Sequence, residues 1–197
     1  MKFTENIEQV SGLYPDYMGF IFYEKSKRNF EGVIPKLPKS IKKTGVFVNE
    51  YPEIVISLVE EYQLEAIQLH GDETVTYIKQ LKTYLPSIEI IKVFGVKDEF
   101  NFDVLTPFLP LVDYFLFDTK GKERGGNGVQ FDWSVLEAYP YEKPFFLSGG
   151  IGLKDLLAIQ KIIDSNVPIY ALDINSKFEI EPGLKNINEV KTFKNKL

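Results

Sequence analysis

Short apolar runs rich in β-branched and aromatic residues alternate with segments of helical periodicity along the whole chain. The runs are apolar at nearly every position, as expected for strands whose two faces are both buried in a parallel sheet. This alternation is typical of βα units and predicts a parallel α/β architecture. The seven predicted strands span residues 16–23, 43–49, 65–71, 88–96, 114–121, 144–151 and 170–178.

One helical segment precedes the first of these strands, and one follows each strand. Thr4 is expected to be the N-cap of the first helix. Asp72 and Glu73 are expected in the first turn of a later helix, where they suit the positive end of its dipole. The eight predicted helices span residues 4–12, 33–40, 51–63, 72–85, 102–112, 131–139, 153–164 and 187–197.

An eight-stranded (β/α)8 TIM barrel that lacks its first strand accounts for this order, because the first helix has no strand before it. Barrels of this class begin at roughly 200 residues, which suits a chain of 197. A flavodoxin-like open sheet has about five strands and would leave units over. No linker or low-complexity stretch divides the chain, so we expect residues 1–197 to form a single domain.

The composition excludes several classes of function. The chain has no cysteine, which rules out a disulfide framework, a thiolate zinc site and a cysteine nucleophile or base among these residues. A net charge of −5 and scattered lysines argue against nucleic-acid binding. The apolar runs are shorter than the roughly 20 residues that span a bilayer, and no leader pattern begins the chain. We therefore expect a soluble cytoplasmic protein without a nucleic-acid or membrane partner.

Working residues in TIM barrels project from the carboxyl ends of the strands and from the loops that follow. Asp118 comes after the apolar run YFLF, where burial favours the protonated carboxyl that a general acid needs. A turn or cap role is the alternative for this aspartate. Gln68 and His70 end another strand and are candidates for substrate binding, although a structural role is also open for His70, the only histidine. Arg28 follows the first predicted strand.

Two strand ends are candidates for binding a phosphate group through backbone N–H groups. Gly149 and Gly150 end the sixth predicted strand, directly before a helix that starts at Leu153. Asn175 and Ser176 end the seventh predicted strand. In TIM barrels a phosphate frequently binds in the loops after the last two strands. Both positions therefore suit a phosphorylated ligand.

A further glycine-rich stretch lies between the fifth and sixth predicted strands. Its glycines are spaced neither as in a Walker loop nor as in a dinucleotide fingerprint. We interpret the stretch as a mobile loop over the mouth of the barrel. The glycines concerned are Gly125, Gly126 and Gly128.

Taken together, six stretches resemble the phosphoribosylanthranilate isomerase family of tryptophan biosynthesis, in the family's order and spacing. They are DYMGFIFYEKSKR, GVFVN, IQLHGDE, FDTKGKERGGNGVQFDW, FLSGGI and DINSKFEIEPGLKN. The resemblance implies a (β/α)8 barrel that uses no metal and no organic cofactor and takes a small-molecule substrate. It also implies an Amadori rearrangement of N-(5'-phosphoribosyl)anthranilate to 1-(2-carboxyphenylamino)-1-deoxyribulose 5-phosphate. This is an aldose–ketose isomerisation, which belongs to the intramolecular oxidoreductases.

At the matching positions, the resemblance makes Asp118 the general acid that opens the ribose ring. Arg28 would bind the anthranilate carboxylate with its forked guanidinium, and His70 would lie in the substrate pocket. Many members of the family have glycine where this chain has Lys177, whose cation would either aid phosphate binding or point to solvent. Backbone groups would hold the phosphate at Gly149, Gly150, Asn175 and Ser176.

The resemblance also implies that part of the site is missing here. Family members begin with a strand that ends in a cysteine-containing motif, and this cysteine is the general base. Met1 falls where that motif's methionine would be, so we expect the first strand and its cysteine to be absent, through an internal start or a deletion. The chain is then expected to turn over little or no substrate. Its two uncovered sheet edges are expected to favour a homodimer.

Two other functions remain open at this point. A barrel that lost its base during evolution would bind a phosphorylated small molecule without catalysis. The DNA upstream of the start codon would distinguish such a protein from a shortened enzyme. A different phosphosugar enzyme, indole-glycerol-phosphate synthase, is disfavoured because the lysine and paired glutamates that it needs are not found at these strand ends.

Overall fold

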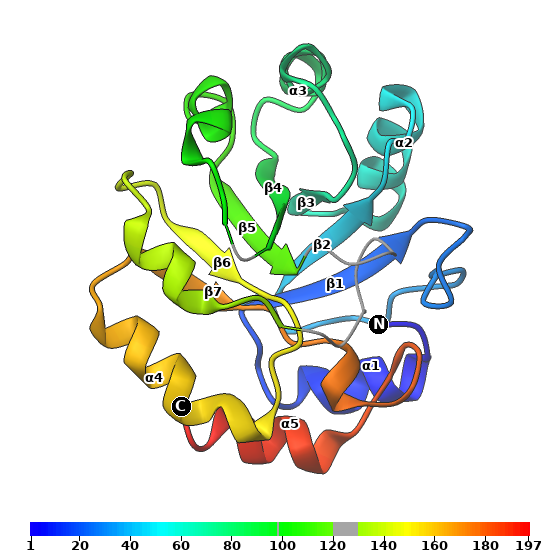
Figure 1. The fold of residues 1–197 in the computed structure, drawn as a ribbon. Coiled ribbons are helices and arrows are strands. Elements are labelled where there is room, and N and C mark those ends of the chain that lie inside the picture. Colours follow the sequence, from blue (N-terminus) through cyan, green and yellow to red (C-terminus); the bar gives the residue numbers. More distant parts are fainter. Residues whose placement is uncertain (98, 120–129) are drawn as a thin grey trace. The chain divides into compact units, whose positions relative to one another are not determined.

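The structure is a computed structural model that describes residues 1–97, 99–119 and 130–197. Its main sheet has seven strands in the hydrogen-bonded order β1-β2-β3-β4-β5-β6-β7, which is also their order in the sequence (Figure 1). The strands are β1 (Tyr17–Phe22), β2 (Lys42–Phe47), β3 (Ala66–Leu69), β4 (Glu89–Val96), β5 (Tyr114–Thr119), β6 (Phe145–Leu147) and β7 (Ile169–Leu172). All seven predicted strands are therefore confirmed.

Helices follow each of these strands except β1, where the alternation had also predicted one. The α-helices are α1 (Thr4–Ser11), α2 (Pro52–Tyr62), α3 (Val75–Tyr84), α4 (Leu156–Asp164) and α5 (Ile187–Lys194). In the part of the chain that the structure describes, four segments are 3-10 helices, namely η1 (Phe102–Phe108), η2 (Trp133–Ala138), η3 (Leu153–Asp155) and η4 (Ser176–Phe178). A short antiparallel pair that was not predicted, β8 (Glu179–Glu181) and β9 (Leu184–Lys185), precedes α5. Within the described residues, every helix is too short or too polar to cross a bilayer.

Three predictions about helix termini and connections were wrong. Phe3, not Thr4, is the N-cap of α1, because the Ile7 amide already donates to the Phe3 carbonyl and starts the first turn. Helix α3 begins at Val75, after an N-cap threonine that accepts the Tyr77 amide, so Asp72 and Glu73 precede it. Residues 33–40 form no helix, since two prolines disfavour the helical conformation of the residues before them.

Two other predicted helices are 3-10 rather than α-helical. The segment predicted at 102–112 is η1, and Pro107 inside it removes one backbone donor. The segment predicted at 131–139 is η2, which ends just before Pro140. Of the eight predicted helices, five are therefore α-helices within the described residues, and these are α1 to α5.

The chain forms two compact units, which are described separately. The first comprises Met1–Ile91 and Glu179–Ile187, and the second comprises Lys92–Phe178 and Asn188–Leu197, with β4 running from one into the other. The prediction of a single domain stays a prediction.

In the first unit, β1, β2 and β3 pair in parallel and end level with one another. Phe22 pairs with Phe47, which pairs in turn with Leu69. The rings of Phe22 and Phe47 stack with centroids 5.4 Å apart, and Phe30 packs against Phe22 and Phe20. Because the three strands end level, the loops that follow them leave from one edge of the sheet.

In the second unit, β5, β6 and β7 also pair in parallel. Phe117 pairs with Leu147, which pairs in turn with Leu172. The Phe117 and Phe145 rings meet edge to face at 5.0 Å, and Tyr139 packs against both. This apolar core fixes the carboxyl ends of the three strands.

Candidate active site

The loop after β1, which carries Arg28, is anchored to β1 itself. The Phe30 amide donates to the Ile21 carbonyl at 2.8 Å, and the Tyr23 amide donates to the Asn29 side-chain oxygen at 2.9 Å. The Ser26 hydroxyl accepts the Arg28 amide at 3.1 Å. The phenylalanine at the end of the loop is buried in the core of the first unit. Arg28 therefore projects from a loop with a fixed backbone.

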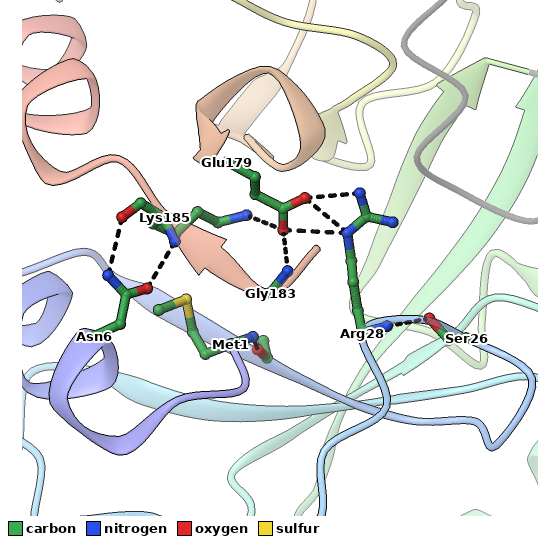
Figure 2. Close-up of polar contacts among 8 residues, drawn as sticks. Met1, Asn6, Ser26, Arg28, Glu179, Gly183 and Lys185 are labelled. Carbon is green, nitrogen blue, oxygen red and sulfur yellow. Dashed lines mark hydrogen bonds and ion pairs between the residues drawn. The ribbon is translucent and has the colours of Figure 1, made fainter. Parts of the chain in front are cut away.

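The guanidinium of Arg28 binds the carboxylate of Glu179 on β8 (Figure 2). Nε lies 2.9 Å and Nη2 lies 2.7 Å from Oε2, and the Glu179 side chain is 4% exposed. Burial raises the pKa of Glu179, but hydrogen bonds from Arg28 and the charge of Lys185 outweigh it, so the pKa lies below its usual value. The carboxylate is therefore charged at neutral pH.

Gln68 and His70, both predicted to bind substrate, lie together at the end of β3. His70 Nδ1 is 3.1 Å from the Gln68 side-chain oxygen, and the His70 amide donates to the Phe47 carbonyl at 2.8 Å. Gln68 is buried, whereas His70 is half-buried.

A buried carboxylate holds the turn that follows His70. Glu73 accepts the Asn49 amide at 2.8 Å and the Gly71 amide at 2.9 and 3.0 Å. The Asn49 side chain accepts the Asp72 amide at 2.6 Å, and its own backbone lies in the left-handed region with φ 52°. These bonds connect the loops after β2 and β3 and fix the backbone next to His70.

We expect Glu73→Ala to destabilise the protein by about 2–4 kcal/mol, because it leaves the buried Gly71 amide and the part-buried Asn49 amide without their acceptor. Urea unfolding followed by circular dichroism measures this change. Glu60→Ala, on the exposed face of α2, is the matched control and should change stability by no more than about 0.5 kcal/mol. Equal losses in the two variants would contradict the structural role of Glu73.

In the second unit, Asp118 lies near the end of β5 and is 9% exposed. Its Oδ1 accepts the Thr119 amide at 2.8 Å. The Ser148 amide donates to the Phe117 carbonyl at 2.9 Å and ties the end of β6 to β5. Asp118 is thus a buried carboxyl group beside apolar strand residues, with one oxygen held by the next amide. Its role as a general acid stays a prediction.

The two glycines after β6 have backbone conformations that favour glycine. Gly149 has φ 95° and Gly150 has φ 70°, a region that other residues rarely adopt. A Cβ on Gly149 would lie 2.5 Å from Thr119 Oγ1 and 2.9 Å from its amide nitrogen. Thr119 Oγ1 is buried and has no hydrogen-bond partner among the described residues. Gly149 therefore packs directly on the residue that follows Asp118.

The end of β7 lies beside the same segment. The Ser148 hydroxyl is 3.2 Å from the Asp173 carboxylate, and the Asp173 amide donates to the Leu147 carbonyl at 2.8 Å. A Cβ on Gly152 would lie 3.5 Å from Cβ of Lys177, a residue of η4. The structure thus brings the loop after β6 together with the segment that contains the predicted phosphate residues Asn175 and Ser176. The glycine-rich loop with Gly125, Gly126 and Gly128 lies outside the described residues.

The protein-family comparison identifies the relationship. The model of N-(5'-phosphoribosyl)anthranilate (PRA) isomerase matches residues 2–196. The chain belongs to the phosphoribosylanthranilate isomerase family. The predicted family and the predicted enzyme class, an isomerase, are thereby confirmed.

Individual phosphoribosylanthranilate isomerases agree with this assignment. The enzyme of Parabacteroides distasonis is 40% identical over 200 residues, a match that covers 98% of this chain and 88% of the relative. A crystal structure of the Thermotoga maritima enzyme has a TM-score of 0.82 and 31% identity, and covers all of this chain and 94% of the other. A second structure, of monomers generated from the dimeric Thermotoga maritima enzyme, has a TM-score of 0.74 and 28% identity, with the same coverage.

Sequence reasoning missed three residues that lie beside candidate site residues within their own units. Glu179, Glu73 and Thr119 each contact a predicted site residue or the backbone beside one. All three residues lie within stretches that resemble the family. A search for the acid that neutralises Arg28 would have drawn attention to Glu179. Nothing in the local pattern distinguishes Glu73 from an ordinary acidic residue before a helix.

Proposed function

We propose that this chain acts on N-(5'-phosphoribosyl)anthranilate and converts it to 1-(2-carboxyphenylamino)-1-deoxyribulose 5-phosphate in tryptophan biosynthesis. Membership of the isomerase family supports this substrate. The observation that carries the chemistry is Asp118, a buried carboxyl of fixed orientation at the carboxyl end of a β-strand. Enzymes of the TIM-barrel class place their working residues at such strand ends.

In the proposed reaction, Asp118 donates a proton to the ribose ring oxygen. The bond between this oxygen and C1' breaks, and the lone pair of the anthranilate nitrogen forms a C1'–N double bond. A base then removes the proton from C2', which gives an enolamine. Addition of a proton to C1' and loss of the proton of the C2' hydroxyl then give the ketone at C2'. Hydrogen moves within one molecule, so the sequence of steps balances without an added oxidant or reductant.

Other residues are proposed to bind the two anionic ends of the substrate. Arg28 would bind the anthranilate carboxylate, and Gln68 and His70 would contact the substrate beside it. The amides after β6 and at the start of η4 would bind the phosphate, as N–H groups at helix starts commonly do. These amides belong to Gly149, Gly150, Asn175 and Ser176. Lys177 is exposed and makes no ion pair among the described residues, which suits a cation that attracts the phosphate.

The resemblance assigns the general base to a cysteine, and the given 197 residues contain none, so they leave the base unassigned. We propose that removal of the C2' proton is the step that these residues support least. The N-terminal nitrogen donates to the Gly19 carbonyl of β1 at 2.5 Å, so a segment joined to Met1 would begin beside β1. This geometry allows a direct test of the missing base.

The test compares the 197-residue chain with two fusions that add a strand segment before Met1, one ending in cysteine and the other in serine. We expect the cysteine fusion to exceed both other proteins by at least about a hundredfold in kcat for freshly generated substrate, as expected for a general base. All three should bind a reduced, non-reacting product analogue. If the 197-residue chain matches the cysteine fusion, another residue supplies the base. If no protein binds the analogue, the proposed function is wrong.

Three further points belong to this proposal. The parallel strand order and the likeness to the Thermotoga maritima isomerase support a (β/α)8 barrel.

The dimeric state of that relative supports a homodimer here, and sedimentation velocity should give a mass near twice 22.7 kDa. A measured mass equal to that of one chain at every protein concentration would contradict the dimer.

The charged, phosphorylated substrate stays in the compartment where it is made, which supports a cytoplasmic enzyme.

A further inference from the structure

The carboxylate of Glu179 is the centre of a buried ionic network in the first unit (Figure 2). It accepts Nε of Arg28 at 2.9 and 3.1 Å and Nη2 of Arg28 at 2.7 Å. It also accepts Nζ of Lys185 at 3.0 Å and the Gly183 amide at 3.1 Å. Four donors from three residues therefore fix both carboxylate oxygens.

The network continues from Glu179 to the first helix. Asn6 on α1 donates to the Lys185 carbonyl at 2.9 Å and accepts the Lys185 amide at 2.7 Å. Both residues are buried. Gly183, in the turn between β8 and β9, has φ 89°, which favours glycine at this position. The carboxylate is thus held by a turn and by a strand that are themselves anchored.

The geometry leaves one edge of the Arg28 guanidinium open. A guanidinium has two edges that can bind a carboxylate, one formed by Nε with a terminal nitrogen and one formed by both terminal nitrogens. Glu179 occupies the Nε edge. Nη1 donates to no acceptor among the described residues. The edge formed by Nη1 and Nη2 therefore remains for a second carboxylate.

We propose that Glu179 is a positioning residue that fixes the Arg28 guanidinium so that its Nη1–Nη2 edge faces the ring carboxylate of the substrate. This inference rests on the proposed function, because it takes the anthranilate carboxylate as the ligand of Arg28. An arginine without this partner would sample several rotamers and would lose conformational entropy on binding. Glu179 removes that cost before the substrate arrives.

The experiment measures binding by calorimetry rather than turnover, so it does not depend on the base. The two probes are the reduced product analogue and the same molecule without its ring carboxylate. The discrimination is the dissociation constant of the carboxylate-free probe divided by that of the carboxylated probe. We expect Glu179→Gln to lower this ratio by about tenfold, through weaker binding of the carboxylated probe alone. Glu181→Gln, on the exposed side of the same hairpin, should leave both affinities unchanged.

Two more variants separate positioning from a structural role. Arg28→Gln should lower the ratio at least as far as Glu179→Gln does. The variant that carries both changes should have the same ratio as Arg28→Gln alone, because Glu179 acts through the arginine. Glu179→Asp keeps the charge but shortens the side chain, and it should lower the ratio less than Glu179→Gln. If Glu179→Gln does not fold, Glu179→Asp alone distinguishes a positioning role from a structural role. The carboxylate-free probe reports whether each variant retains a folded site.

The possible results have distinct meanings. Equal weakening of both probes in the Glu179 variants would overturn the inference, since a purely structural residue acts on both. Unchanged discrimination in Arg28→Gln would overturn it as well, while leaving the proposed isomerisation intact. If the unaltered protein bound neither probe, the proposed function and the inference would both be wrong.

Discussion

Replacing Asp118 with asparagine is expected to lower kcat about a hundredfold to ten-thousandfold, the range that a general acid contributes. The amide keeps the size of the carboxyl and an oxygen that can accept the Thr119 amide, so the end of β5 should keep its geometry. It has no proton that it can give to the ribose ring oxygen. The measurement is steady-state turnover in the cysteine fusion, where the largest starting activity is expected.

The control for this prediction lies on the same strand segment. Asp113 precedes β5, at the opposite end of the strand from Asp118, and is exposed. Asp113→Asn should change kcat by less than about twofold, as expected for a surface substitution away from the site. Affinity for the reduced product analogue should survive in both variants. If Asp118→Asn kept full turnover, the general acid would be another residue.

The second large effect is expected at Gly149. Alanine there would adopt a left-handed φ and place a methyl group against the Thr119 backbone, so we expect a loss of about 2–4 kcal/mol in stability. Thr119 must move to relieve the contact, and its amide donates to Asp118. Phosphate binding and acid catalysis should therefore weaken together, with a higher KM and a lower kcat. Urea unfolding and steady-state kinetics measure the two effects.

Gly12→Ala is the matched control for Gly149→Ala. Gly12 has φ −64° at the end of α1, and a Cβ there would be no closer than 3.4 Å to another atom. The substitution should leave stability unchanged or raise it by up to about 1 kcal/mol, because alanine restricts the unfolded chain. Similar losses in the two variants would show that the effect at Gly149 is a general cost of replacing glycine.

Local sequence patterns predicted most of the architecture. Apolar runs identified all seven strands because strands of a parallel sheet are buried on both faces. The errors arose where local propensity competed with another constraint. Prolines prevented a helix at residues 33–40, and Glu73 became the acceptor for a turn instead of part of the first turn of α3.

The site was predicted in part. Asp118 was identified from the apolar run before it, and the glycines after β6 from their place in the strand order. Their chemical roles stay predictions. The partner of Arg28 was not predicted, because the resemblance assigned that arginine to the substrate and the protein's own carboxylate lies 151 residues away.

The sequence by itself determined the identity and order of the strands and the family to which the chain belongs. These follow from periodicity over a few residues and from short motifs, which the linear order preserves. Only the tertiary structure decided that Arg28 binds Glu179, that Glu73 holds the turn after His70 and that Gly149 packs on Thr119. Each of these contacts depends on which strand ends and loops become neighbours, and that is set by strand pairing and core packing rather than by local propensity.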